Sequence, residues 1–116
     1  MQIPRTLDDV LETAVGGGAT SVTFELEPDG LEVAYFHGSA GIGVLVTDRD
    51  VEQSILKDLA HRAKLGTRTS RNLRLTIHSN VYDVCVTARD HFGETAYDLQ
   101  FETAAQAPQS EPRRRR

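Results

Sequence analysis

The sequence predicts an α+β domain in which two helices pack on an antiparallel sheet of about six strands. The first observation behind this prediction is a hairpin pattern over residues 19–38, where two runs of alternating polar and apolar residues flank a Pro-Asp-Gly reversal. The second is the helical spacing of apolar residues in segments 7–14 and 51–63. The third is a set of alternating runs after the second helical segment. The predicted order is therefore α-β-β-β-α-β-β-β.

The first helix is predicted to begin after Thr6. Thr6 and Asp9 resemble a capping box, in which the threonine side chain accepts a hydrogen bond from a free N–H group at the start of a helix. The apolar residues of the helix form one face and comprise Leu7, Val10, Leu11 and Ala14. The glycine triplet 16–18 is interpreted as the end of the helix. A phosphate-binding loop would follow a strand and precede a helix, which is the opposite order.

Residues 21–36 are predicted to form a hairpin. Polar and apolar side chains alternate in 21–27, which is typical of a strand with one buried face. The reversal at 28–30 combines a proline that presets φ with a glycine that tolerates positive φ. A return strand is predicted at 31–36, and a third strand, short and well buried, is predicted at 42–46.

A second helix is predicted to start at a cap formed by Thr47 or Asp48. Its apolar stripe comprises Val51, Ile55, Leu56, Leu59, Ala60 and Ala63. The other side, which includes Glu52, is expected to face water. Lys64 and Gly66 are ordinary stop signals. Since each large buried aliphatic side chain contributes roughly 1.5–3 kcal/mol, this helix should be the main cover of the core.

The second half of the chain predicts three more strands, at 73–78, 81–88 and 94–101. The first reversal is predicted at 79–80, where an asparagine tolerates the left-handed conformation. The second is predicted at 89–93.

Length and composition are consistent with a single domain, predicted to cover residues 1–103 of the 116. Residues 104–116 contain no large apolar residue and end in four arginines, so they predict a disordered basic tail. No apolar run reaches the ~20 residues that span a bilayer, and the N-terminus lacks a signal-peptide core. A cytoplasmic protein without a transmembrane segment is therefore expected. Cys85 is the single cysteine and is interpreted as a small core residue.

The charge distribution argues against a nucleic-acid partner. The formal net charge is −4, and without the four terminal arginines the rest of the chain carries −8. Such a body repels phosphate backbones. One basic cluster within 62–74 is a candidate interaction patch for an acidic partner or a phosphate group, and the alternative is a helix end followed by a solvated loop. The members of this basic cluster are Arg62, Lys64, Arg68, Arg71 and Arg74.

The sequence predicts neither an enzyme nor a cofactor or metal site. The histidines occupy a strand end, a helix, a strand and a turn without the spacing of metal ligands, and they are His37, His61, His78 and His91. Asp83 and Asp98 fall on neighbouring predicted strands and could be paired carboxylates, but such residues are far more commonly on a solvent-facing side of a strand. No nucleophile elbow and no P-loop is present in the sequence.

The order of the segments resembles a known family. Residues 19–26 (ATSVTFEL) stand where that family has a strand of the form ASDIHIEP, and 31–38 (LEVAYFHG) stand where it has one of the form VRxRIDG. The helical segment 56–65 and the Phe-Gly-Glu turn at 92–94 match the family's next helix and final hairpin. The chain thus resembles the PAS-like N-terminal domain of type II secretion and type IV pilus ATPases (GspE, PilB and PilT). The resemblance covers about 6–101 and lacks the motor domain.

The chain differs from the family at the positions of its arginines, and this difference determines the expected function. Family members carry arginines that reach ATP phosphates, and the corresponding places here are Ala34, Phe36 and Cys85. The resemblance therefore implies a non-catalytic protein-interaction or regulatory module. Its expected partner is a protein, either a secretion or pilus ATPase or a second copy of the chain. Two alternatives stay open, namely a small-molecule or nucleotide sensor with a ligand against the sheet, and a weak nucleic-acid binder that uses the basic cluster and the tail.

Overall fold

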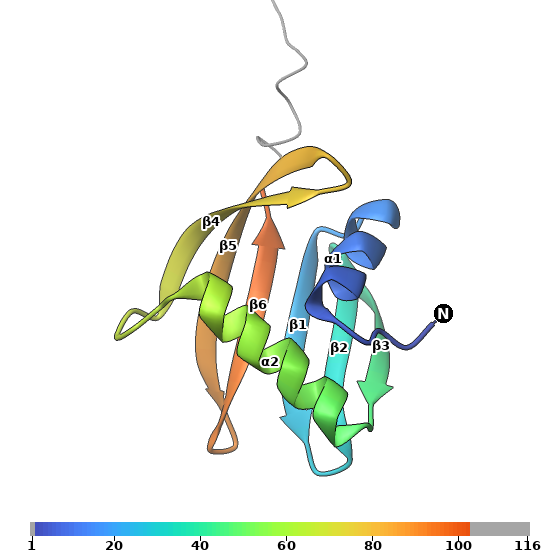
Figure 1. Cartoon of the computed structure of the whole chain (residues 1–116), viewed down its shortest axis with the longest axis vertical. Coiled ribbons are helices and arrows are strands. Elements are labelled where there is room, and N and C mark those ends of the chain that lie inside the picture. Colours follow the sequence, from blue (N-terminus) through green and yellow to red (C-terminus); the bar gives the residue numbers. More distant parts are fainter. Residues whose placement is uncertain (1, 103–116) are drawn as a thin grey trace, which may run out of the picture.

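The computed structural model describes residues 2–102, and the predicted tail at 104–116 lies outside this range. The described chain contains two helices and six strands, as the sequence predicted (Figure 1). In chain order they are α1 (Leu7–Gly16), β1 (Ser21–Glu27), β2 (Gly30–His37), β3 (Ala40–Val46), α2 (Arg49–Ala63), β4 (Ser70–Ile77), β5 (Asn80–His91) and β6 (Glu94–Phe101). Within the described range, no helix has the length and apolar character needed to cross a membrane.

The six strands form one antiparallel sheet in the order β3-β2-β1-β6-β5-β4. Each half of the chain supplies a three-stranded meander, and the two meanders meet where β1 pairs with β6. Both helices lie on the same face of the sheet (Figure 1). We call this the helix face and the opposite one the open face. The edges of the sheet are β3 and β4.

The core lies between the helices and the helix face. Alternation along each strand places apolar side chains on this face, because successive residues of a strand point to opposite sides. The largest buried side chains of the sheet include Phe24, Leu31, Val33, Val84 and Leu99, and those of the helices include Leu7, Leu11, Ile55 and Leu59. Burial of each contributes roughly 1.5–3 kcal/mol, which makes this layer the main source of stability.

The helix caps follow the predicted residues with one difference. The side chain of Thr6 accepts a hydrogen bond from the N–H of Asp9 at 3.1 Å. The carboxylate of Asp9 accepts from the N–H of Arg5 at 3.0 Å, one residue earlier than in a standard capping box. In α2 the cap is Asp48, whose carboxylate accepts from the N–H of Val51 at 3.2 Å. The predictions of both helix starts are confirmed.

Two predicted reversals are wrong in position. The β4–β5 turn is formed by His78 and Ser79, both at positive φ (53° and 68°), and Asn80 already pairs with Ile77. Two consecutive positive φ angles give a twist that matches that of the flanking strands. In the last hairpin, β5 continues to His91, so that residues predicted to turn at 89–91 are paired with β6.

Four predictions of burial are also wrong. The third strand, predicted to be well buried, is mostly exposed in β3, and Ala60 of the predicted apolar stripe is exposed on α2. Cys85 is half-buried on the open face rather than in the core, because its neighbours Val84 and Val86 take the core-facing positions. Glu52, expected to face water, is buried on α2. Glu52 lies in the first turn of α2, where the positive end of the helix dipole favours a carboxylate.

Gly30, at the start of β2, is required by a close approach between backbones. Its φ is +152°, and a Cβ at this position would lie 2.2 Å from the carbonyl oxygen of Val46. Real Cβ atoms do not approach backbone atoms so closely, so any side chain would push β2 away from the end of β3.

We expect Gly30→Ala to lower the free energy of unfolding by at least about 2 kcal/mol, because the added methyl collides with backbone that cannot rotate aside. The matched control is Gly38→Ala, where φ is +61° but the space is free. Gly38→Ala should lower the free energy of unfolding by only roughly 1–2 kcal/mol, because an alanine is strained in the left-handed conformation but meets no neighbouring atom. Urea denaturation of both variants measures the difference. Equal losses would show that the close approach is not the cause.

Tyr35 makes the fold sensitive to high pH. Burial raises the pKa of Tyr35 from its ordinary value of 10.0 to about 12; a hydrogen bond with Thr13 lowers it in part, and the charge of Asp9 raises it further. The fold therefore favours the neutral phenol. Its contribution to stability is complete below the unfolded pKa near pH 10 and is lost as the pH rises toward 12.

We expect Tyr35→Phe to flatten the loss of stability between about pH 10 and pH 12, by roughly 2–3 kcal/mol over that interval. Guanidinium denaturation at a series of pH values measures the slope for both proteins. The same slope in Tyr35→Phe as in the wild type would place the alkaline sensitivity at other groups.

Candidate functional site

The open face carries a cluster of charged side chains centred on Arg89 of β5. The Nε of Arg89 donates to Asp98 Oδ2 of β6 at 2.8 Å. Its Nη2 donates to Glu25 Oε2 of β1 and to the second oxygen of Asp98. One guanidinium thus ties three strands together. Because a planar guanidinium presents several donors in a fixed geometry, it suits this bridging role.

The cluster continues with His91 and Glu27. The Nε2 of His91 lies 2.9 Å from Glu27 Oε2, and its Nδ1 lies 4.0 Å from Glu25 Oε2. One ligand atom from each of Glu25, Glu27 and His91 can be chosen so that all three lie within 4.8 Å of one another. We call the full set the open-face cluster, and its members are Glu25, Glu27, Arg89, His91 and Asp98.

The residues of the cluster are brought together by the topology of the sheet. β1 and β5 are not neighbours, since β6 lies between them. On β6 the residue beneath the bridge is Ala96, which pairs with Arg89 in the register and is fully buried. A small side chain at this place leaves room for the guanidinium to cross to Glu25.

Sequence reasoning missed the open-face cluster because it ended β5 at Ala88. The signal that could have found it is the polar alternation of Thr87, Arg89 and His91, which continues the open face of the strand. Even with that signal, the partner Glu25 lies 64 residues away in the chain, so only the tertiary structure brings it to Arg89.

Hydrogen bonding keeps Arg89, at the centre of the open-face cluster, positively charged. The bonds to Asp98 and then to Glu25 raise the pKa of Arg89 beyond its already high ordinary value, against a smaller lowering by burial. Arg89 therefore stays charged under all ordinary conditions. The arrangement can orient carboxylates and attract a cation.

The basic cluster predicted from the sequence is divided by the structure. Arg62 bonds Asp58 on its own helix and Asp8 of α1, each at 3.0 Å. Burial lowers the pKa of Arg62, but these two hydrogen bonds outweigh it and raise the pKa. Arg71 donates to the carbonyl oxygen of Ala63 at 3.0 Å and so satisfies the end of α2.

The remaining members of the basic cluster lie on two different elements. Arg74 lies on the open face and pairs with Asp83 at 3.1 Å. Lys64 and Arg68 are exposed in the connection between α2 and β4. The structure thus gives acidic partners to Arg62 and Arg74 and a backbone carbonyl partner to Arg71. The use of the basic cluster as an interaction patch stays a prediction.

The pairing of Asp83 with Asp98, which the sequence left open as an alternative, does not occur. Asp83 bonds Arg74, and Asp98 bonds Arg89, so each carboxylate has an arginine partner on a neighbouring strand. The register explains the separation, since Asp98 stands opposite Thr87 on β5, four residues beyond Asp83. Two carboxylates that each pair with a separate arginine form structural ion pairs rather than an acid–base dyad.

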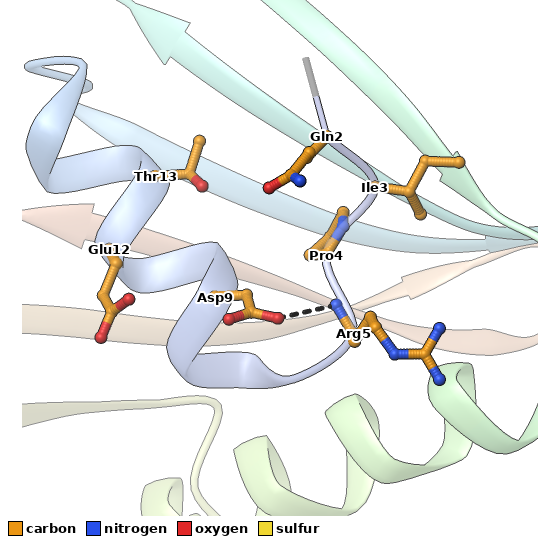
Figure 2. Close-up of a pocket in the computed structure, with 7 residues that line it drawn as sticks. All are labelled: Gln2, Ile3, Pro4, Arg5, Asp9, Glu12 and Thr13. Atoms are coloured by element: carbon orange, nitrogen blue, oxygen red, sulfur yellow. Dashed lines mark hydrogen bonds between the residues drawn. The ribbon is translucent and has the colours of Figure 1, made fainter.

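A cavity of about 380 Å³ lies between the N-terminal segment and α1 (Figure 2). Its lining residues are Gln2, Ile3, Pro4, Arg5, Asp9, Glu12 and Thr13. Most of these side chains are exposed, so a ligand here would keep much of its surface in water, unlike ligands of typical binding pockets. The sensor alternative needs space beside Phe24, Tyr35 and Val84, and all three are packed in the core. The cavity therefore does not favour that alternative.

The edge strand β3 presents an unprotected apolar border. It pairs with β2 on one side only, and its seven residues include no charged residue and no proline. Ile42 on the helix face is 60% exposed, and Leu45 on the open face is 37% exposed. Edge strands usually avoid unwanted pairing by charges, prolines or bulges. The other edge, β4, has such protection in Arg71 and Arg74.

Two glycines of β3 leave room for side chains of β2 on the open face. A Cβ at Gly41 would lie 2.5 Å from Cε1 of Phe36, and one at Gly43 would lie 2.9 Å from a carboxylate oxygen of Glu32. The side chains of β2 therefore lie over the glycines of β3. The half-buried ring of Phe36 and the side chain of Leu45 both lie on the open face, next to the edge.

We expect Arg89→Ala to lower the free energy of unfolding by about 1–3 kcal/mol, because Glu25 and Asp98 lose their common partner while half-buried. The matched control is Arg74→Ala. Its ion pair is 74% exposed on the arginine side, compared with 36% for Arg89, and should be worth less than about 1 kcal/mol. Chemical denaturation compares the two. A loss in Arg74→Ala as large as in Arg89→Ala would contradict a special role for the cluster.

Known proteins do not supply a family for this chain. No model of a protein family matches it, and no curated protein matches it.

Proposed function

We propose that this chain is a non-catalytic protein-interaction module that binds a partner strand along the free edge of β3. The observation that carries the proposal is an edge strand of seven residues without charge or proline, with exposed apolar side chains on both faces. An extended segment that adds to such an edge gains backbone hydrogen bonds from the strand and apolar contacts from Ile42 and Leu45.

A second copy of the chain is the partner that suits this edge best. In a symmetric pair the same surface meets itself, so a charged strand would place like charges close together. β3 has no charge to oppose, whereas self-pairing of β4 would bring Arg71 and Arg74 near their counterparts. Pairing of two β3 strands would join two sheets of six strands into one continuous sheet.

The positions of the family's arginines support an interaction role. Ala34, Phe36 and Cys85 replace these residues in the resemblance to secretion and pilus ATPases, and all three lie on the open face. Ala34 and Phe36 stand directly beside β3. Where the family would place positive charge near a phosphate, this chain has the uncharged residues Ala34 and Phe36 next to a free edge. A strand of a secretion or pilus ATPase is the second partner that we propose for the same edge.

We expect the tag-free chain to form a weak, concentration-dependent dimer with a micromolar or weaker dissociation constant, since two short strands bury a small interface. Ile42→Lys combined with Leu45→Lys should make the chain monomeric at every concentration, because the lysines place like charges opposite each other and hinder edge pairing. Sedimentation equilibrium measures the association of both proteins.

The control is Thr76→Lys combined with Arg74→Lys on the other edge, which should leave the dimer unchanged. Circular dichroism establishes that each variant is folded. A wild-type chain that stays monomeric up to millimolar concentration would overturn self-association. A dimer that survives the β3 lysines would place the interface elsewhere and overturn the role of this edge.

A further inference from the structure

Two carboxylates and an imidazole of the open-face cluster converge from opposite halves of the chain. Glu25 and Glu27 lie two residues apart on β1, which places both on the same face of the strand. His91 is the last residue of β5. The pairing between β1 and β6 runs only from Ser21 to Phe24, so the strands separate just where the two glutamates stand. The ribbons of β1 and β6 diverge in this direction (Figure 1).

The distances within this group suit a common metal ion. Zinc binds imidazole nitrogen and carboxylate oxygen at about 2.0–2.2 Å, so two ligands of one ion stand roughly 3 Å apart. The Nε2 of His91 and Oε2 of Glu27 are 2.9 Å apart. With Glu25 included, the three ligand atoms lie within 4.8 Å of one another.

The burial of the group favours a defined site that solvent can still reach. The side chains of His91, Glu25 and Glu27 are 18%, 23% and 36% exposed. Long exposed side chains lose more rotamer freedom when they bind an ion, and these are already held in part by their surroundings. The remaining exposure allows an ion to enter and allows water to complete its coordination.

Arg89 and Asp98 act as an outer layer around the ligands. Arg89 bonds Glu25 through Oε2 and is itself held by Asp98. Carboxylate ligands of metal sites are commonly oriented by such hydrogen bonds. The positive charge of Arg89 opposes a cation, but three carboxylates outnumber it, so the open-face cluster carries a net charge of about −2 with a neutral imidazole. The field at the group therefore attracts a divalent cation.

We propose that Glu25, Glu27 and His91 form a binding site for a divalent first-row transition metal, with zinc as the representative ion. The imidazole selects zinc, cobalt or nickel over magnesium and calcium, which prefer oxygen ligands alone. The ion would join β1 to β5 across β6 at the place where the β1–β6 pairing has ended. This site is independent of the β3 edge and of its partner.

The test is zinc titration of the tag-free, chelator-treated full chain by isothermal titration calorimetry. We expect one zinc ion per chain with micromolar affinity and no competition from an excess of magnesium. His91→Ala and Glu27→Gln should each weaken binding by at least about tenfold. The second variant preserves side-chain shape, so it decides the matter if His91→Ala does not fold. The matched control is His61→Ala, which removes an exposed histidine on α2 and should leave the affinity unchanged.

A second readout follows the ligands directly. In NMR spectra, zinc should shift the imidazole resonances of His91 and leave those of His61 in place. No zinc binding at millimolar metal would overturn the proposal and leave the group as a hydrogen-bonded structural cluster. Equal affinity in the wild type, His91→Ala and Glu27→Gln would overturn it as well, by placing the ion at other residues.

Discussion

The antiparallel pairing of β1 with β6 is the contact on which the rest of the structure depends. It joins Val22 to Leu99 and Phe24 to Tyr97, residues more than seventy positions apart in the chain. Each meander can form from local turns, but neither can bury its apolar face alone. The loop between β1 and β6 must close before the helices have a continuous surface to cover, and closure of a long loop has an entropic cost that only the completed core offsets.

That central pairing also determines how the two faces of the sheet differ. On the helix face, residues from both halves of the chain merge into one apolar layer. On the open face, the same register brings the acidic side of β1 toward the basic end of β5, and Arg89 bridges them above Ala96. The pairing stops at Phe24, and the residues beyond it form the group of Glu25, Glu27 and His91. The open-face cluster is thus a direct product of where the pairing ends.

The sheet order gives the two edges different chemical characters. The outer strand of the first meander is β3, which contains only uncharged residues. The outer strand of the second meander is β4, in which Arg74 pairs with Asp83 and Arg71 bonds the end of α2. A closed barrel would have removed both edges. The open sheet keeps them, and the contrast between a bare edge and a charged one makes β3 the surface best suited to another strand.

Local chemistry was sufficient to predict most of the elements. Thr6 and Asp48 marked the helix starts, the Pro-Asp-Gly reversal marked the first hairpin, and alternation placed Val22 and Phe24 in the core. The errors arose where a local signal competed with long-range pairing. Polar residues at the end of β5 resembled a turn, yet pairing with β6 extended the strand through Arg89 and His91.

The sequence by itself determined the helices, the strands and the side of each that is apolar, because these follow from the geometry of neighbouring residues. Only the tertiary structure decided which strands lie in the middle and which at the edges, and which charges meet. Arg62 and Arg71 lie close to other basic residues in the sequence, but in the structure each of them makes contacts with a helix. Glu25 and Arg89 are 64 residues apart in the sequence and form a direct ion pair. Those outcomes depend on the sheet register, which is set by burial of the whole apolar face and not by any short segment.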